Sequence, residues 1–241
     1  MKIEFQRLIR NNFLILFTLI NLLCVIFGYI LLVSIDRIDL VTFEAMFESV
    51  YTVYTQFGEL LFSALILMQF YVDYKDKNIM FYKVMGTEST RYYLNKLICI
   101  ILVTCIGTIL TSLLVTLPYG RIDMIPVVFC KIEMVMIYYC AIMTLLGFLI
   151  KNFVVAFFLN LFLWILGIVV ASINSSLRFF AYYDASTKDY SRLLELIDGG
   201  KPATTYFKEL IVGNIIFDTF VIAACIAVAC VCFKRWIKNG I

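Results

Sequence analysis

The sequence predicts an all-α membrane protein with six transmembrane helices, and its composition is the first reason. The chain of 241 residues is 63% hydrophobic and 15% charged, which is more apolar surface than a soluble domain of this size can bury. Six stretches also reach the length of roughly 20 apolar residues that a spanning helix needs. Neither a separate soluble domain nor an internal repeat is evident, so residues 1–241 are interpreted as one transmembrane domain.

Three predicted spans contain no charged residue, and three contain one or two. The uncharged spans are residues 13–35, 97–117 and 153–173. The charged spans are 49–72 with Glu59, 125–150 with Lys131 and Glu133, and 210–233 with Asp218. The first span is longer than the apolar part of a signal peptide and no small-residue cleavage site follows it, so we expect it to remain in the membrane.

The distribution of basic residues predicts that both termini are cytoplasmic. With six spans the termini share one side, and that side holds twelve of the twenty Lys and Arg residues against four acidic residues. The opposite side holds eight basic and thirteen acidic residues. Because Lys and Arg are retained on the cytoplasmic side during insertion, the chain is expected to be a multi-pass protein of the cell membrane with its termini inside.

Residues 1–12 show apolar side chains at helical spacing, with Phe5, Leu8 and Ile9 on one face. This pattern predicts a short amphipathic helix on the inner membrane surface, although a frayed start of the first span fits it as well. An acidic outer loop, residues 36–48, then leads to the second span.

The charged segment 73–96 lies on the cytoplasmic side between the second and third spans. Its first half predicts an amphipathic helix with Met80, Phe81 and Val84 on one side and lysines elsewhere. Gly86 is a natural stop for this helix, and Thr87 or Ser89 is a natural N-cap for the next one. The predicted order is therefore a short helix, a glycine turn and the entry into the third span.

The remaining connections are two tight turns and one long outer loop. Residues 118–123 form an outer turn and residues 151–152 an inner turn, so the fourth and fifth spans make a hairpin. The loop 174–209 predicts an amphipathic helix at 191–197 and a second one that is capped by Thr204 or Thr205 and leads into the last span. These two helices form the outer helical segment expected before that span.

Charged residues inside spans are costly, by about 2.5–3.5 kcal/mol each at the membrane centre. We therefore expect Glu59 in the outer half of its span and Lys131 reaching outward to water. One interpretation is that these groups pair with each other or with water. The other is that Glu59, with Gln56 and Asp218, lines an outward-facing substrate path. The mid-span amides Asn21 and Asn160 predict hydrogen bonds between helices, and Gly28, Gly107, Gly147 and Gly167 predict close packing.

The sequence argues against several kinds of chemistry. It has no histidine, which excludes histidine-based catalysis and histidine metal sites. It has no Walker A motif for ATP, and we find no convergent catalytic set, so no catalytic residue, metal or cofactor is assigned. The eight cysteines lie in or beside apolar spans and are interpreted as small buried residues. Anionic lipid and orientation explain the basic residues better than nucleic acid does.

The layout as a whole resembles the ABC-2 type permease subunits of ABC transporters. The segment Tyr74-Lys75-Asp76-Lys77, then Lys83 through Tyr92, with Asn95-Lys96 opening the third span, is similar to the loop of that family. It differs in having Thr87-Glu88 where many members have a proline before the Ser-Arg pair. The small size and the Phe-, Ile- and Tyr-rich composition look like permeases for lantibiotic immunity or for export of amphipathic peptides.

This resemblance implies a permease that works with two cytosolic ATP-binding subunits and with a second permease, identical or a sister chain. ATP and Mg²⁺ would bind to the ATP-binding subunits. The residues that the resemblance assigns to ATPase coupling are Asp76, Lys77, Met80, Phe81, Lys83, Val84, Gly86 and Arg91.

Three other classes stay open from the sequence alone. The first alternative is a non-transporting immunity or sensor protein that binds a peptide through outer-loop residues such as Phe179 and Tyr183. A secondary transporter is less favoured, because most spans lack charges near the middle. An enzyme is least favoured.

Overall fold

The computed structural model describes residues 2–38, 40–173, 177, 179, 181–184, 192 and 211–234, and this part of the chain is helical with no strands. Its helices are α1 (Lys2–Arg10), α2 (Phe13–Ile30), α3 (Phe43–Lys75), α4 (Asn78–Val84), α5 (Ser89–Thr116), α6 (Ile125–Leu149), α7 (Phe153–Ile173) and α10 (Val212–Val231). A π-helical turn, Leu31–Ile35, extends α2. Six of these helices are long and apolar enough to cross a membrane, so the predicted fold class is confirmed for the described residues.

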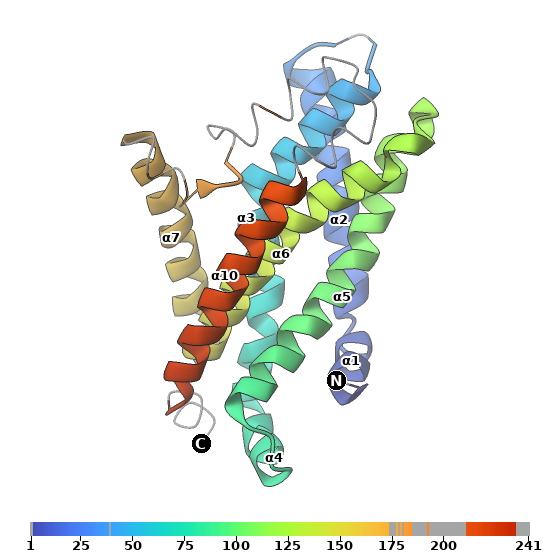
Figure 1. Ribbon diagram of the computed structural model, residues 1–241. Helices are drawn as coiled ribbons and strands as arrows, with labels where there is room; N and C mark the ends of the chain where they lie inside the picture. Colours follow the sequence, from blue (N-terminus) through green and yellow to red (C-terminus); the bar gives the residue numbers. More distant parts are fainter. Residues whose placement is uncertain are drawn as a thin grey trace.

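The core of the protein is a bundle of α2, α3, α5 and α6, and α3 and α6 lie at its centre (Figure 1). The helix α7 packs on α3 and α6, whereas α10 packs on α6 and α5. In the most apolar stretch of α7 only 17% of the residues are buried, whereas in that of α6 67% are buried. The peripheral helices therefore present most of their apolar side chains outward, as expected for contact with lipid.

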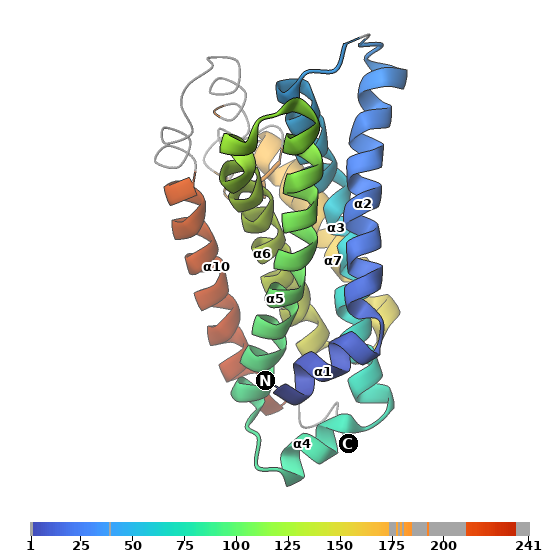
Figure 2. The same ribbon diagram turned by 90° about the vertical axis from the view of Figure 1, so that its right-hand side faces the viewer.

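Both α1 and α4 lie at one end of the bundle, which we call the α4 end, and the last turn of α10 reaches the same end (Figures 1 and 2). The chain thus enters and leaves the described bundle on one side. The N-terminal helix is separated from α2 at Asn12, whose φ is 55°. It is therefore a helix of its own and not the first turns of α2.

Two helices are longer than the apolar stretches that predicted them. The helix α3 begins at Phe43, where Thr42 accepts a hydrogen bond of 3.3 Å from the amide of Ala45, and it ends at Lys75. The helix α5 begins at Ser89, before the apolar span 97–117 and next to the N-cap expected at Thr87 or Ser89. Polar residues continue each helix beyond its apolar part, because hydropathy marks the membrane region and not the end of backbone hydrogen bonding.

Three predicted glycine contacts are tight in the structure, and one is at Gly28, where a Cβ would lie 2.7 Å from Val50. A Cβ on Gly107 would lie 2.5 Å from the amide nitrogen of Asn21, and one on Gly147 would lie 2.6 Å from the ring of Phe70. The interhelical hydrogen bond predicted for Asn21 is also present, since the hydroxyl of Tyr54 donates to its side-chain oxygen. Gly107 and Gly147 thus let helices approach more closely than any side chain would allow.

The two charged residues of α6, Lys131 and Glu133, are both buried inside the bundle. Lys131 is fully buried with its ammonium 5.5 Å from the ring centre of Tyr51, so the expectation that it reaches outward was wrong. The carboxylate of Glu133 accepts hydrogen bonds from Thr104 at 3.0 Å and from Thr108 at 2.6 Å. The hydroxyl-rich face of α5 therefore stabilises Glu133 inside the bundle.

The predicted inner turn at 151–152 is confirmed, because α6 ends at Leu149 and α7 begins at Phe153. The side-chain oxygen of Asn152 caps α7 by accepting from the amide of Val154 at 2.9 Å. The helices predicted at 191–197 and from Thr204 or Thr205 lie outside the described residues.

Candidate functional site

The connector between α3 and α5 has the predicted order of helix, glycine turn and helix. The chain leaves α3 through Lys77, whose φ is 55°, forms α4, and turns at Gly86, whose φ is 72°. Glycine adopts this left-handed backbone without the steric cost that a Cβ brings. The expected cap of the next helix was wrong: Glu88 occupies the N-cap position of α5, and its side chain makes no capping hydrogen bond.

The short helix α4 has one anchored face and one exposed face. Ile79 and Tyr82 are buried against the bundle. The exposed apolar side chains are Met80, Phe81, Val84 and Met85, and their exposed fractions are 46%, 57%, 87% and 53%. The charged residues Asp76, Lys77, Lys83 and Arg91 that were assigned to coupling are exposed around them. The connector therefore presents an apolar knob with a charged rim, which we call the α4 knob (residues 80, 81, 84 and 85).

Beneath the α4 knob lies a buried group of four charged residues, which we call the ion cluster: Glu4, Arg7, Asp73 and Lys96. The guanidinium of Arg7 and the ammonium of Lys96 both donate to the carboxylate of Asp73, the latter at 2.7 Å. Lys96 also reaches Glu4 at 3.3 Å, and Arg7 reaches the other oxygen of Glu4 at 3.3 Å. Two acidic and two basic residues thus form a cyclic network of ion pairs that joins α1, α3 and α5.

Neutral donors complete the ion cluster and extend it to the connector. The hydroxyl of Tyr92 donates to Asp73 at 2.7 Å, and the side-chain amide of Asn78 donates to it at 3.3 Å. The hydroxyl of Tyr82, on the buried face of α4, accepts from Arg7 at 2.7 Å. Buried charges are tolerated when paired and hydrogen-bonded in this way, so the cluster fixes α4 to the ends of three other helices.

The environment of Arg7 keeps that residue charged. Burial alone lowers the pKa of its guanidinium, but the carboxylates of Asp73 and Glu4 outweigh this effect and hold the pKa above its ordinary value. Arg7 therefore stays positively charged in the ion cluster at every pH at which the protein would function.

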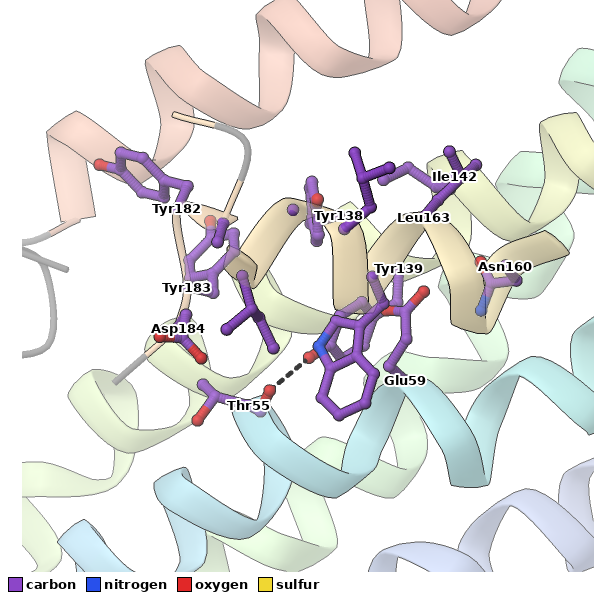
Figure 3. Close-up of a pocket in the computed structure, with 15 residues that line it drawn as sticks. Thr55, Glu59, Tyr138, Tyr139, Ile142, Asn160, Leu163, Tyr182, Tyr183 and Asp184 are labelled. Carbon is purple, nitrogen blue, oxygen red and sulfur yellow. Dashed lines mark hydrogen bonds between the residues drawn. The ribbon is translucent and has the colours of Figure 1, made fainter. Parts of the chain in front are cut away.

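A second candidate site is a cavity of about 260 Å³ between α3, α6 and α7, closed on one side by residues 181–184. Figure 3 shows the carboxylate of Glu59 and the amide of Asn160 at its wall. Glu59 is only 3% exposed and Asn160 only 1%. We call this space the Glu59 cavity. Glu59 is the middle residue of α3, which begins early at Phe43, and its position in the outer half of the membrane stays a prediction.

The other two residues predicted for a substrate path do not line the cavity but hold its cover. The amide of Gln56 donates to Asp184 at 3.0 Å, and the carboxylate of Asp218 accepts from Tyr183 at 2.9 Å. Tyr182 stacks on Phe217 with ring centres 4.0 Å apart. The segment 181–184 is thus tied to α3 through Asp184, and to α10 through the hydrogen bond of Tyr183 and a second one, of 3.3 Å, from Tyr182 to Asn214.

Several wall residues of the Glu59 cavity were not assigned from the sequence. Aromatic side chains of Tyr138, Tyr139 and Trp164 line it, and the hydroxyl of Tyr139 donates to the carbonyl of Thr55 at 3.1 Å (Figure 3). Asn160 was expected to bond to another helix, but neither atom of its amide has a hydrogen-bond partner among the described residues. Gly167, predicted as a packing point, lines the cavity as well.

Neither site has the composition of a metal centre. Among the residues described by the structure, no group of three or more His, Cys, Asp or Glu side chains lies close enough to hold a metal ion. The ion cluster contains two carboxylates, but both are engaged by cations of the protein itself. The ion cluster is a network of ion pairs that joins helix ends. The Glu59 cavity is a polar recess in an apolar wall.

Comparison with known proteins agrees with the class expected from the resemblance. The sequence is 28% identical over 247 residues to a Bacillus subtilis (strain 168) protein named as a probable peptide export permease protein, YydJ, and the match covers the whole of both chains. No solved structure matches this chain. The family model of the peptide export permease protein YydJ family matches residues 1–241, so the chain belongs to that family of permeases.

Proposed function

We propose that this chain is the membrane-spanning subunit of an ATP-driven exporter that moves an amphipathic peptide, antibiotic or other hydrophobic substrate out of the cell or out of the membrane. Separate cytosolic ATP-binding cassette subunits bind ATP and Mg²⁺ and dock on the α4 knob. The family name supports peptide as the cargo. The resemblance to ABC-2 type permeases supports the ATP-driven partnership.

The exposed α4 knob is the observation that carries this proposal. Four large apolar side chains, Met80, Phe81, Val84 and Met85, are exposed in a connector that lies between two spans and outside them. Exposed apolar patches outside the membrane are typical of protein interfaces, and a charged rim adds specificity. A cytosolic partner with a matching groove would cover this surface.

The ion cluster supports a mechanical role for the docked α4. Asp73 lies in the last turn of α3, Lys96 lies in the first turns of α5, and Arg7 contacts Tyr82 of α4 itself. A displacement of α4 is therefore transferred to both neighbouring spans and to α1 through buried, hydrogen-bonded contacts. An element without such contacts would move without moving the helices.

The orientation follows from charge. The α4 end holds the excess of Lys and Arg, so we place it, with both termini, in the cytoplasm. The largely exposed apolar faces of α2 and α7 support contact with lipid and with a second permease, identical or a sister chain. No role for nucleic acid is proposed.

Co-purification tests the docking proposal directly. The affinity-tagged chain is co-expressed with the P-loop ATPase encoded nearest to it, and the bound ATPase is quantified. We expect the double variant Phe81→Ser/Val84→Ser to retain at most about a tenth of the bound ATPase, because burying each apolar side chain contributes about 1.5–3 kcal/mol. ATP-dependent uptake of a fluorescent amphipathic peptide into inverted vesicles should fall in parallel.

The matched control is Leu40→Ser, which makes a similar change at a side chain that is 81% exposed in the connection between α2 and α3. It should leave both measurements unchanged. Undiminished ATPase binding and uptake in the α4 double variant would refute docking at this surface.

A second function is favoured by one observation, the aromatic cover formed by Tyr182, Tyr183 and Phe217. A non-transporting immunity or sensor protein would bind a peptide there without any ATPase. Failure of every ATPase to co-purify, combined with peptide binding to the chain alone, would support that alternative.

A further inference from the structure

The Glu59 cavity contains polar atoms that the protein itself leaves without partners. One carboxylate oxygen of Glu59, Oε2, and both amide atoms of Asn160 are buried and have no hydrogen-bond partner among the described residues. Leaving such groups unsatisfied in a low-dielectric region costs free energy, and the cost is greatest for a carboxylate. A buried polar group that persists under this cost is a candidate for binding an external ligand.

The charge of the wall restricts which ligand fits. Among the described residues that line the cavity, the ionisable side chains are the carboxyls of Glu59 and Asp184 and the hydroxyls of four tyrosines, and none is Lys or Arg. Asp184 already accepts a hydrogen bond from Gln56. Of the two carboxyl groups, Glu59 is therefore the one with a buried oxygen that accepts no hydrogen bond from the described residues. Ionised Glu59 would pair with a cation, whereas the described lining residues offer no basic group to an anion.

The shape and the aromatic wall agree with this charge. At about 260 Å³ the cavity is slightly smaller than the roughly 300–1,000 Å³ of small-molecule sites, so it suits one side chain or one chain terminus and not a whole peptide. Trp164, Tyr138 and Tyr139 offer ring faces, and aromatic faces stabilise ammonium and guanidinium groups through cation–π attraction.

We propose that the Glu59 cavity is a recognition site for a single cationic group of the transported peptide, an ammonium or a guanidinium, which pairs with Glu59 and Asn160. This inference rests on the proposed function for the identity of the ligand as a peptide. The segment 181–184 covers the bound group, and its hydrogen bonds to Gln56 and Asp218 hold it in place.

Fluorescence of Trp164 gives a direct readout, since the sequence contains two tryptophans, at 164 and 236. In a Trp236→Phe background purified in nonionic detergent, the chain is titrated with an eight-residue amphipathic peptide that lacks Trp and carries one Lys. Three forms are compared: both amines free, the N-terminus acetylated, and both amines acetylated. Partial acetylation distinguishes the side-chain ammonium from the terminal one.

We expect a saturable fluorescence change with the free peptide and binding at least about tenfold weaker for the doubly acetylated form, because hydrogen bonds to charged groups are the strong ones. Glu59→Gln should weaken binding of the free peptide by at least about tenfold and remove the preference for it. Asn160→Leu, which fills the recess with apolar atoms, should also weaken binding. The control Glu44→Gln changes an exposed carboxylate of the same helix and should bind like the parent.

The thermal midpoint of Glu59→Gln should equal or exceed that of the parent, because the variant removes an unpaired buried carboxylate. Parent-like affinity in Glu59→Gln, equal binding of free and fully acetylated peptides, or no saturable signal with the free peptide would each overturn the inference. The titration needs no ATPase, and Glu59→Gln should retain ATPase co-purification. Loss of the proposed function and loss of this site are thus separate outcomes.

Discussion

Asp73→Asn is the most informative test of the ion cluster, because this carboxylate is the point where four donors meet. Arg7, Asn78, Tyr92 and Lys96 all donate to Asp73, whose side chain is 0% exposed. The isosteric amide keeps the volume but removes the charge, which leaves two cations facing Glu4 alone. Breaking a buried ion pair from one side costs about 3–5 kcal/mol, so unfolding should become easier by that amount.

The chain carries its own probe for the measurement. Cys24 and Cys140 are free and buried, so a thiol-reactive fluorogenic maleimide reports their exposure when the detergent-solubilised protein is heated. For a chain of this size each 1 kcal/mol shifts the midpoint by about 2–4 °C, so Asp73→Asn should lower it by about 6–20 °C. Glu4→Gln should have a smaller effect, since its carboxylate holds the same cations at 3.3 Å only.

The matched control is Asp76→Asn, which makes the same chemical change at an exposed side chain just beyond the end of α3. Its midpoint should stay within about 2 °C of the parent, since exposed surface changes are usually worth less than 0.5 kcal/mol. Equal midpoints for the Asp73 and Asp76 variants would refute the reasoning that the cluster is a tightly coupled junction.

The same thermal assay tests two further features of the bundle. Gly147→Ala places a Cβ 2.6 Å from Phe70 and should lower the free energy of unfolding by about 1–3 kcal/mol. The control Gly213→Ala, whose Cβ meets its nearest atom at 3.5 Å, should leave it unchanged. Equal midpoints of the two variants would contradict close packing at Gly147. Tyr54→Phe removes the hydrogen bonds to Asn21 and Thr111 and should lower the free energy of unfolding by about 1–3 kcal/mol. The control Tyr29→Phe, at a half-exposed ring, should not change it. An unchanged midpoint in Tyr54→Phe would contradict the burial of that network.

The spans and the connector were predictable because each depends on local sequence. A run such as residues 153–173 contains no charge, so its length alone identifies a spanning helix, and α7 has the same bounds. Gly86 likewise marks its turn locally, through the backbone freedom of glycine. The start of α3 was missed because its first turns carry Glu44 and Glu48 and lie outside the apolar signal, whereas the start of α5 lies close to the expected cap at Thr87 or Ser89.

The two sites were only partly predictable, because their members are far apart in the chain. Arg7 and Asp73 are 66 positions apart, and Glu4 and Lys96 are 92 apart. From the sequence these residues counted as charges that set orientation, and no local pattern indicates that they meet. Glu59 was identified as costly at membrane depth. That this carboxylate lines the same cavity as Asn160 and Trp164 of α7 depends on how α3 and α7 pack.

The helix α3 connects the two sites physically. Asp73 lies in its last turn and Glu59 at its middle, about 21 Å apart at 1.5 Å per residue, and no proline interrupts the helix between them. The end of α3 at Asp73 is held by charged residues of α1 and α5 and by the neutral Asn78 of α4. The wall near Glu59 is underpacked and lined by α7, whose other faces are exposed. Because α3 is held at Asp73 and borders the cavity at Glu59, a displacement of its Asp73 end is transferred toward the cavity. Packed contacts resist compression, whereas empty space does not. The separation of a stiff junction from a yielding recess on one helix is the arrangement that a permease needs if a cytosolic partner is to change the environment of its cargo.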